Sequence, residues 1–426
     1  MVISGITKNV LILGLVSLFT DVSSEMIYPL LPIFLTNILN AGPAFIGIIE
    51  GVAESTASIV KLFSGWFSDR VKKRKVLILT GYSLSTVSRP LVAIASSWLH
   101  VLFIRFSDRV GKGIRTAPRD ALIADSSHPS VWGKAFGFHR SMDHAGAVMG
   151  PLIATLLLYA FILDYRTIFW VAAIPGIISV ILIVFFVSEV APFTDRSSEL
   201  SNKSIHSTVK RPAIHNAPSP LSSREDNNPV MNKIKAARGI LDSRLNQFII
   251  IIVIFTLGNS SDAFLILRAH KLGVTSIQIP LLWLLLHIVK MMSSMPGGAL
   301  SDKIDRRYVI ISGWLVYSAI YFAFAFATET YQVWILFALY GIYFGLTEGT
   351  ERALVSDMVL PEERGTAFGL YHFAVGMSLL PASILMGLFW QGFGAKFAFS
   401  FGALLSIIAS LLLFLTTIRK GERTKT

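Results

Sequence analysis

The sequence predicts an all-α integral membrane protein made of two copies of one helical unit, and three observations support this. Of the 426 residues, 53% are hydrophobic and only 15% are charged, with a mean hydropathy of +0.62, whereas soluble domains have about 25% charged residues. Apolar runs of bilayer-spanning length recur along the chain. Residues 121–125 (ALIAD) and 133–137 (GKAFG) return 232 residues later as 353–357 (ALVSD) and 365–369 (GTAFG). A repeat of that length indicates a duplicated domain.

Twelve membrane-spanning helices are expected, six in each half. The chain then divides into an N-terminal bundle at 1–187, a flexible linker at 188–246 rich in Ser, Asn, Pro and charge, and a C-terminal bundle at 247–426 with a polar tail. A short surface helix is expected near 231–241 in the linker. The first apolar run is too long for a signal-peptide core, so it is expected to be retained. The spans are predicted near residues 8–36, 44–68, 76–96, 98–119, 135–161, 167–187, 247–271, 277–301, 308–327, 331–356, 366–390 and 397–418.

The charge pattern predicts the orientation in the membrane. The net charge is +12, and its basic residues gather in the loop at 70–75, the loop at 303–307, the linker and the tail. The opposite loops offer only Arg166, Lys271 and Lys396. This distribution is typical of cytoplasmic loops, so both termini are expected in the cytoplasm, and no nucleic-acid partner is indicated.

Several classes of chemistry are not indicated by the sequence. There are no cysteines, no His cluster with metal-ligand spacing and no nucleophile–base set, so neither an enzyme nor a metal or other cofactor is expected. The phosphate-binding pattern GxxxxGK[ST] is also missing, which argues against ATP-driven transport by this chain alone.

One loop motif occurs in both halves, as GWFSDRVKKRK at 65–75 and GALSDKIDRR at 298–307. A small Gly allows close helix packing, and an Asp at a helix end can face basic groups or the N-terminus of another helix. The doubled pattern resembles the G-x-x-x-D-R-x-x-R-R/K signature of the major facilitator superfamily. The resemblance implies a conformational latch at Gly65, Asp69, Arg70, Gly298 and Asp302. The alternative is that the motif is a topology signal alone.

The resemblance covers nearly the whole chain except the linker. The runs DRVGKGIRTAPRDALIADS and AFGFHRSMDHAGAVMGP look like a bacterial branch of the superfamily that is described as permeases or efflux proteins. It implies the fold of that superfamily, with two pseudo-symmetric six-helix bundles, and a monomer in the bacterial inner membrane.

The fourth predicted span carries a stripe of charge. Arg105, Asp108, Arg109, Lys112 and Arg115 follow helical i, i+3, i+4 spacing. A charge in hydrocarbon costs from about 2.5 to more than 10 kcal/mol, so the stripe is expected to face a water-filled cavity or paired acids. It is interpreted either as a cationic wall for an anionic substrate or for coupling to protons, or as an internal salt-bridge network.

Few acidic residues are available to pair with this charged stripe. Asp21 and Glu25 share one face of the first span with Tyr28, and Asp262 in the seventh span echoes them, because Ser260-Ser261-Asp262 parallels Ser23-Ser24-Glu25. In the family, helices one, four, seven and ten line the central cavity, so the resemblance places Asp21, Glu25, Arg105, Arg109 and Asp262 on the substrate path. These acids, and Asp143 in the fifth span, could carry protons; the alternative is a permanent ion pair for each.

The fifth span continues into Gly146, Gly150 and Pro151, which resemble the G-x-x-x-G-P core associated with antiporters of the superfamily. The small residues permit close backbone approach. The fuller pattern ends in a Gly pair, where this chain has Ala154 and Thr155, so an antiport assignment is weakened.

Two sequence positions predict contacts between helices. Arg119-Asp120 corresponds to Glu351-Arg352 with the charges inverted, and these residues are expected to pair across the two halves when the cytoplasmic side closes. Pairing within each loop is the alternative. On the second span, Lys61 is expected to pair with an acid and not to contact substrate.

The functional expectation is a secondary active transporter that moves a small organic solute by alternating access, with an anionic solute favoured over a cationic one. Coupling to protons is expected, and efflux is favoured over uptake. The alternatives are uptake of an organic anion or a siderophore-like polycarboxylate by proton symport, and a lipid translocase on the same fold. The expected partners are the lipid bilayer, the solute and protons.

Overall fold

The computed structural model describes residues 6–31, 34–41, 43–161, 164–190, 229–275 and 278–423, and over these residues it contains helices and no strands. The N-terminal half contains α1 (Lys8–Ile27), the π-helix η1 (Phe34–Ile38), α3 (Pro43–Val71), α4 (Arg74–Ser88), the 3-10 helix η2 (Arg89–Ile94), α5 (Trp98–Asp125), η3 (Pro129–Val131), α6 (Trp132–Phe161), α7 (Tyr165–Val171) and α8 (Ala173–Phe186).

The C-terminal half repeats this order. It contains α10 (Pro229–Gly258), α11 (Ala263–Lys271), α12 (Ile279–Ser301), α13 (Arg306–Phe326), α14 (Thr330–Met358), η4 (Pro361–Glu363) and α15 (Arg364–Arg423). α15 comprises two helices, because Gly394 between them has φ 85° and ψ 167°, a conformation that glycine adopts readily.

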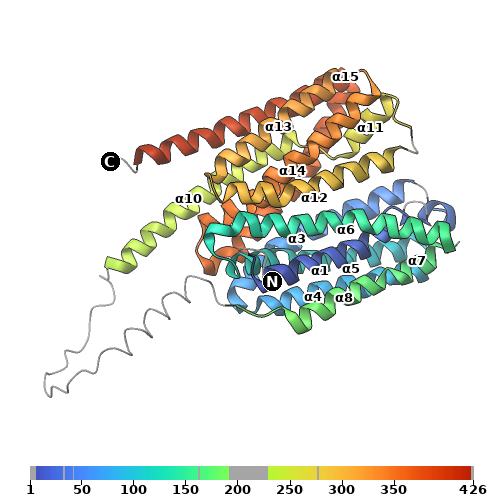
Figure 1. Ribbon diagram of the computed structural model, residues 1–426, viewed down its shortest axis with the longest axis horizontal. Helices are drawn as coiled ribbons and strands as arrows, with labels where there is room; N and C mark the ends of the chain where they lie inside the picture. The colour runs from blue at the N-terminus through green and yellow to red at the C-terminus, as the bar shows by residue number, and fades with distance from the viewer. Residues whose placement is uncertain are drawn as a thin grey trace, which may run out of the picture.

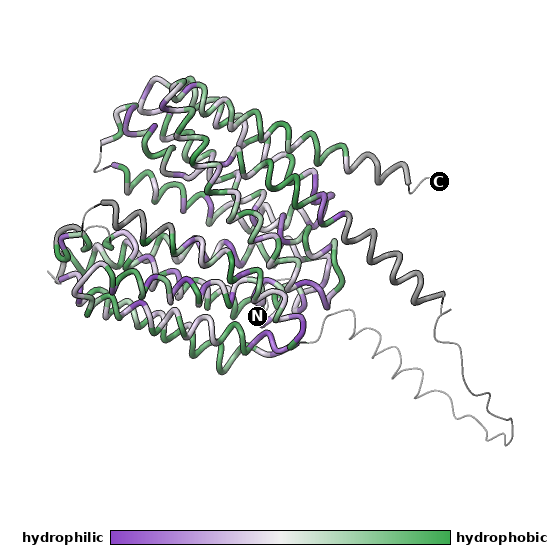
Figure 2. The backbone as a smooth tube through the Cα atoms, turned by 180° about the vertical axis from the view of Figure 1, so that it is seen from behind, coloured by the Kyte–Doolittle hydropathy of each residue, from purple (hydrophilic) through white to green (hydrophobic). Residues whose placement is uncertain are grey.

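The two halves form two bundles that lie side by side, as Figure 1 shows in blue to green and in yellow to red. α1 packs on α6 and α4 on α5 in the first bundle, and α12 packs on α14 and α13 on α15 in the second. Between the bundles, α6 packs on α12 and α3 packs on α15. Hydrophobic residues dominate the outer helices of both bundles (Figure 2), as expected for surfaces that face lipid. The predicted two-bundle membrane fold is confirmed.

Glycines bring the bundles together at one end of the molecule. A Cβ added to Gly65 of α3 would lie 2.1 Å from the carbonyl oxygen of Gly365, and a Cβ on Gly298 of α12 would lie 2.0 Å from that of Gly133. Only glycine permits this approach of backbones. This end, where α3 meets α15 and α12 meets α6, is called the motif end below.

Two predicted spans are interrupted. The first was expected to run over 8–36, but α1 ends at Ile27, two residues before Pro29, which lacks the N–H that a continuing helix requires. The seventh was expected at 247–271, but α10 ends at Gly258 and α11 begins at Ala263, because the intervening residues favour helix ends and caps over helix interiors.

The linker differs in part from its prediction. Its central part, residues 191–228, lies outside the described residues. The helix expected near 231–241 is not a separate surface element, because α10 runs without interruption from Pro229 into the membrane bundle. Seven helices among the described residues are long and apolar enough on their own to span a membrane, and α5, with its charged stripe, is not one of them.

Candidate functional site

A charged cavity of about 420 Å³ lies between the two bundles. α1, α3, α5 and α6 line it from one half, and α12, α14 and α15 line it from the other. Seven Lys or Arg side chains face four Asp or Glu side chains, so the lining has a formal surplus of three positive charges. The basic residues are Lys61, Lys112, Arg115, Arg119, Arg140, Lys290 and Arg352, and the acids are Asp21, Glu25, Asp143 and Glu348.

A smaller chamber of about 120 Å³ adjoins this cavity inside the N-terminal bundle. Asp21, Glu25, Lys112 and Arg115 line both spaces. The remaining lining is formed by Ser24, Tyr28, Arg89, Arg105, Asp108 and Arg109. All five members of the α5 stripe therefore line one or both hollow spaces, together with the two acids and the tyrosine of α1.

The outer part of the stripe is tied into salt bridges. Asp108 accepts from Nε of Arg89 at 3.1 Å and lies 3.8 Å from Arg105. Arg105 also lies over the ring of Tyr28, 5.4 Å from its centroid. Arg109 contacts Glu54 of α3 at 3.0 Å. In this part the stripe forms the predicted salt bridges, and the same residues also line a chamber. Its interpretation as a wall for an anionic substrate stays a prediction.

The inner part of the stripe is less neutralised. Arg115 donates to Ser85 Oγ at 2.8 Å and lies over the ring of Tyr82 at 4.2 Å, both neutral partners. Lys112 and Lys61 form no salt bridge with any residue that the structure describes. The expected pairing of Lys61 with an acid is thus not seen among the described side chains, because Lys61 lines the cavity and Glu54 is bound by Arg109.

Asp21 and Glu25 lie where α1 meets α6. A Cβ added to Gly146 would lie 2.5 Å from the carbonyl oxygen of Leu18 and 2.8 Å from Cβ of Asp21, and one added to Gly150 would lie 2.7 Å from Cβ of Glu25. The two glycines thus let α6 pack directly against the acidic face of α1. Pro151 lies inside α6, which continues to Phe161.

A cross-bundle network surrounds Glu348 of α14. Arg140 of α6 donates to both carboxylate oxygens, at 2.6 and 2.8 Å, and His144 Nε2 lies 3.1 Å from Oε2. Arg140 also contacts Asp143, which accepts from Ser17 of α1 as well. Asp143 is thus held by its own bundle, while Glu348 joins the two bundles through a bidentate pair, the strong form of this interaction.

A second cross-bundle network surrounds Asp120 of α5. Asp120 accepts from Arg119 at 2.9 Å, lies 2.7 Å from His372 Nε2 of α15 and lies 3.4 Å from Arg352 of α14. Of the two predicted pairs across the halves, Asp120 with Arg352 forms and Arg119 with Glu351 does not. Arg119 is bound by its neighbour Asp120, and Glu351 accepts from Trp314 at 3.1 Å and from Tyr371 at 2.6 Å within its own bundle.

Asp262 lies apart from these networks. It stands in the break between α10 and α11, accepts from Tyr340 at 2.9 Å and does not line either charged space. Its placement on the cavity, implied by the resemblance, is wrong for this conformation, because the break turns it towards the tyrosines of the C-terminal bundle.

Two symmetric contacts close the motif end, and the first is called the first clasp (Asp69, Arg74, Asp125). Asp69 of α3 accepts from the backbone amides of Gly365 at 2.9 Å and Thr366 at 2.6 Å, which begin α15. Arg74 contacts Asp69 at 3.4 Å and Asp125 at 2.5 Å. A carboxylate on a helix N-terminus is favoured by the unpaired amides and the helix dipole.

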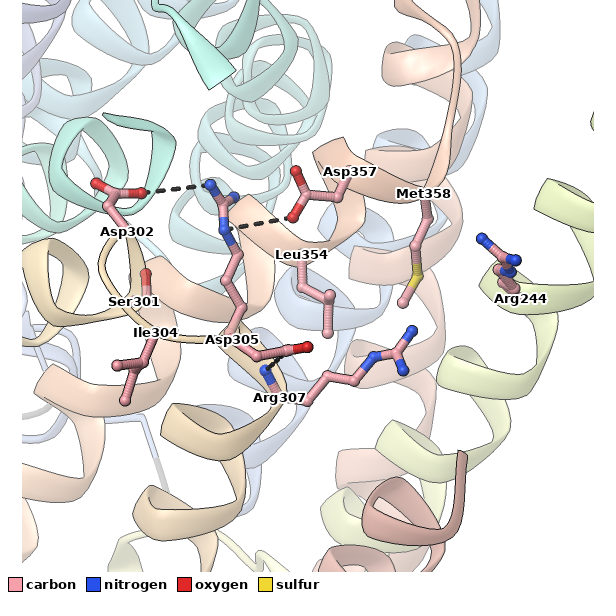
Figure 3. A pocket seen from close by; sticks show the side chains of 10 residues that line it. Arg244, Ser301, Asp302, Ile304, Asp305, Arg307, Leu354, Asp357 and Met358 are labelled. Atoms are coloured by element: carbon pink, nitrogen blue, oxygen red, sulfur yellow. Dashed lines mark hydrogen bonds and ion pairs between the residues drawn. The ribbon is translucent and has the colours of Figure 1, made fainter. Parts of the chain in front are cut away.

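The second clasp (Asp302, Arg306, Asp357) repeats this geometry 232 or 233 residues later. Asp302 accepts from the amides of Gly133 and Lys134 at 2.8 Å each, at the start of α6. Arg306 contacts Asp302 and Asp357, each at 3.3 Å, as the dashed lines in Figure 3 show. Arg70, which the resemblance included in the latch, is exposed and stacks on Trp66 at 3.8 Å, and the cation beside Asp69 is Arg74. Arg74 takes that place because the chain turns at Lys72, which has φ 55°.

The ionisable cavity residues that the sequence analysis did not predict include Glu348, His287, Lys290 and His372. His287 lies 5.5 Å from His144 between ring centroids, and Lys290 Nζ lies 3.3 Å from the centroid of Phe344. The available signal was the presence of His287 and Lys290 in the apolar run LLWLLLHIVKMM, since an ionisable residue inside a span indicates a functional position.

Comparisons with known proteins agree with the fold. A sequence model of the Major Facilitator Superfamily matches residues 13–285 and 245–426. An uncharacterised MFS-type transporter of Methanocaldococcus jannaschii is 36% identical over 416 residues, which cover 96% of this chain and 94% of that protein. The multi-drug resistance efflux pump PmrA of Streptococcus pneumoniae is 24% identical over 415 residues, 95% of each chain.

Two solved structures share the fold at 16% sequence identity. The human organic anion transporter MFSD10 (TETRAN) superposes with a TM-score of 0.70 over 95% of this chain and 99% of its own. The proton:xylose symporter XylE superposes with a TM-score of 0.67 over 96% of this chain and 94% of its own.

Proposed function

Because the chain belongs to the major facilitator superfamily and is a multi-pass membrane transporter, we propose that it carries a small organic anion by alternating access. The surplus of positive charge in the central cavity carries this proposal. Lys61 and Lys112 bring charge into the cavity without a carboxylate partner among the described residues. An unpaired charge at membrane depth is costly, and an anionic solute between these lysines would offset that cost.

Lys112 is the residue that the proposal depends on most, since it lines both the cavity and the smaller chamber. A solute held there can place one anionic group beside Lys61 and Lys112 and a second beside Arg105 or Arg109. The proposal thus favours organic anions, including polycarboxylates, over lipophilic cations.

We propose Asp21 and Glu25 as the groups that bind and release protons. Both line the cavity and the chamber, and neither forms a salt bridge among the described residues. Asp143 is a weaker candidate, because Arg140 and Ser17 hold its carboxylate, and Asp262 does not line the cavity. A proton on Asp21 or Glu25 would raise the positive charge around the anion.

The clasps support an assignment of the conformational state. The positive-inside distribution makes the motif end, with both termini, the cytoplasmic end in this proposal. Both clasps are formed, so this conformation is closed towards the cytoplasm. Release of Asp69 and Asp302 from the helix N-termini would open that side. We favour efflux as the direction, on the partial antiporter motif at Gly146–Pro151 and the similarity to an efflux pump.

A thermal-shift screen of the purified protein tests the proposal. The probes are mono-, di- and tricarboxylates, other organic anions and lipophilic cations, each at one pH below and one above neutrality. We expect stabilisation by a subset of anions that is lost in Lys112→Gln, followed by proton-dependent flux of the same anion in proteoliposomes. Stabilisation by lipophilic cations alone would contradict it.

A further inference from the structure

A separate pocket of about 290 Å³ lies at the motif end of the C-terminal bundle, away from the central cavity. α10 contributes Arg244, the start of α13 contributes Arg306 and Arg307, and α14 contributes Asp357 and Met358. Asp302 and Asp305 line it as well, so three basic and three acidic side chains surround the pocket. Figure 3 shows the side chains of Arg244 and Arg307 on the same side of this pocket, next to Met358.

Two of the three basic side chains in the pocket form no salt bridge with a described residue. Arg306 is bound by Asp302 and Asp357 in the second clasp. The Asp305 carboxylate accepts the backbone amide of Arg307 at 2.9 Å and so caps α13. Neither Arg307 nor Arg244 forms a salt bridge with any described residue. Arg307 is only 8% exposed, and its guanidinium has one weak bond, from Nη1 to the carbonyl oxygen of Thr416 at 3.4 Å.

The internal repeat shows what occupies the same place in the N-terminal bundle. Lys75 corresponds to Arg307, and its Nζ donates to the carbonyl oxygen of Val184 at 2.9 Å, where 184 corresponds to 416. There, Glu189 binds the backbone amides of Arg74 at 3.0 Å and Lys75 at 2.8 Å with its two oxygens. The N-terminal bundle thus supplies its own anion at this helix start.

Among the side chains that the structure describes, no acid takes this role in the C-terminal bundle. The position that corresponds to Glu189 is Gly421, which has no side chain. Asp305 accepts only from the backbone amide of Arg307, which corresponds to the amide of Lys75. Arg244 and Arg307 still line a pocket in which neither forms a salt bridge with a described residue. The repeat therefore indicates that an anion from outside the chain completes this site.

We propose that this pocket binds a phosphate group, held between Arg244 and Arg307. Two planar guanidinium groups match the oxygens of phosphate, and a pocket at the end of membrane spans lies at the depth of lipid head groups. The group belongs to an anionic lipid or to a soluble phosphate compound. In either case it would fasten α10 to α13 beside the second clasp. This site is independent of the transported solute.

The test uses full-length protein stripped of lipid in a neutral detergent, with thermal unfolding followed by tryptophan fluorescence. One arm adds inorganic phosphate against sodium chloride of equal ionic strength. The other adds phosphatidylglycerol against phosphatidylcholine. Saturable stabilisation in both arms indicates that phosphate itself suffices, and stabilisation by phosphatidylglycerol alone assigns the site to a lipid head group.

Arg307→Gln and Arg244→Gln should each remove most of the stabilisation. Lys75→Gln is the matched control, because it loses the corresponding carbonyl contact in the bundle that has Glu189, and its response should equal that of the unmodified protein. Arg244 is exposed, so its variant remains informative even if Arg307→Gln does not fold. No stabilisation in either arm, or equal stabilisation of Arg244→Gln and the unmodified protein, would overturn the proposal.

Discussion

Glu348 is the residue on which the contact between the bundles depends most directly at cavity depth. It binds Arg140 through both oxygens and also lies beside His144, and all three groups are at most about one-fifth exposed in their side chains. Removing one partner of such a pair leaves the other charge without compensation, which is the costly event.

We therefore expect Glu348→Gln to lower the free energy of unfolding by about 2–4 kcal/mol, since the pair is mostly buried and Arg140 keeps Asp143 as a partner. Arg140→Gln should cost a similar amount. The double variant should cost clearly less than the sum, by about 1 kcal/mol or more, because both single changes break one interaction. Denaturation in mixed detergent measures all three, and strict additivity would contradict direct coupling.

The prediction for Lys112 concerns binding of the solute and not the stability of the protein. Lys112→Gln should weaken binding of the most stabilising organic anion by about tenfold, or about 1.4 kcal/mol, because it removes one of the two basic side chains that line both spaces. Lys303→Gln, an exposed lysine in the loop before α13, serves as the control and should leave the affinity unchanged. Anion titrations by thermal shift measure both, and equal affinities would remove Lys112 from the site.

Among the elements, α5 and α14 show how the two copies have diverged. In the 232-residue register, Arg105, Asp108 and Lys112 of α5 correspond to Phe337, Tyr340 and Phe344 of α14. At these three positions α5 thus carries charged side chains that line the cavity or the chamber, whereas α14 carries aromatic rings that line neither space. Lys290 lies over one of these rings, Phe344. The solute site is therefore asymmetric although the fold is symmetric.

The glycines of α3 and α15 control how closely these helices approach. In Gly65→Ala the new Cβ would meet the carbonyl oxygen of Gly365 at 2.1 Å, so the motif end cannot close fully. We expect a longer distance between spin labels at Val76→Cys and Tyr308→Cys, two exposed and symmetry-related positions. The chain has no native cysteine, so labelling is specific. Gly392→Ala, which meets nothing within 4 Å, should leave the distance unchanged.

The sequence predicted most of the elements, and it predicted the site only in part. The repeat, the α5 stripe and the two acidic loop positions could be read from spacing. Helical periodicity is a local property of the sequence, and duplication fixes the register between the two halves. The choice of ion-pair partner for each charged residue could not be read from spacing. Arg74 replaces Arg70 because of one backbone turn at Lys72, and Arg119 binds its neighbour and not Glu351. Such choices depend on helix rotation and on distances across the bundle interface, which spacing does not encode.

At the scale of the whole molecule, two clasps hold one closed state. Asp125 in the first clasp is shared by Arg74 and Arg364, at 2.5 Å each, and the position that corresponds to Arg364 is Trp132 in the other half. The first clasp therefore has an extra cation and is expected to contribute more to closure.

Asp69→Asn and Asp302→Asn should each open the motif end, since a neutral amide is a weaker acceptor of the two backbone N–H groups by about 1–2 kcal/mol. The larger opening is expected for Asp69→Asn, and the double variant should open most. The Val76 and Tyr308 label pair measures this. Asp164→Asn, which alters an acidic helix cap at the opposite end, is the control. A larger effect from Asp302 than from Asp69 would contradict the ranking of the clasps.

Each clasp aspartate accepts hydrogen bonds from main-chain N–H groups of the other bundle. Asp69 accepts from Gly365 and Thr366, and Asp302 accepts from Gly133 and Lys134. Nearly every amino acid offers a backbone N–H group, so the main-chain part of each contact does not depend on which side chain stands at position 366 or 134. Thr366 adds one side-chain bond, because its Oγ1 also donates to Asp69 at 2.7 Å. The aspartates and the glycines, in contrast, cannot be replaced without loss of the contact. Natural variation among related chains should therefore fall unevenly on the two sides of each contact.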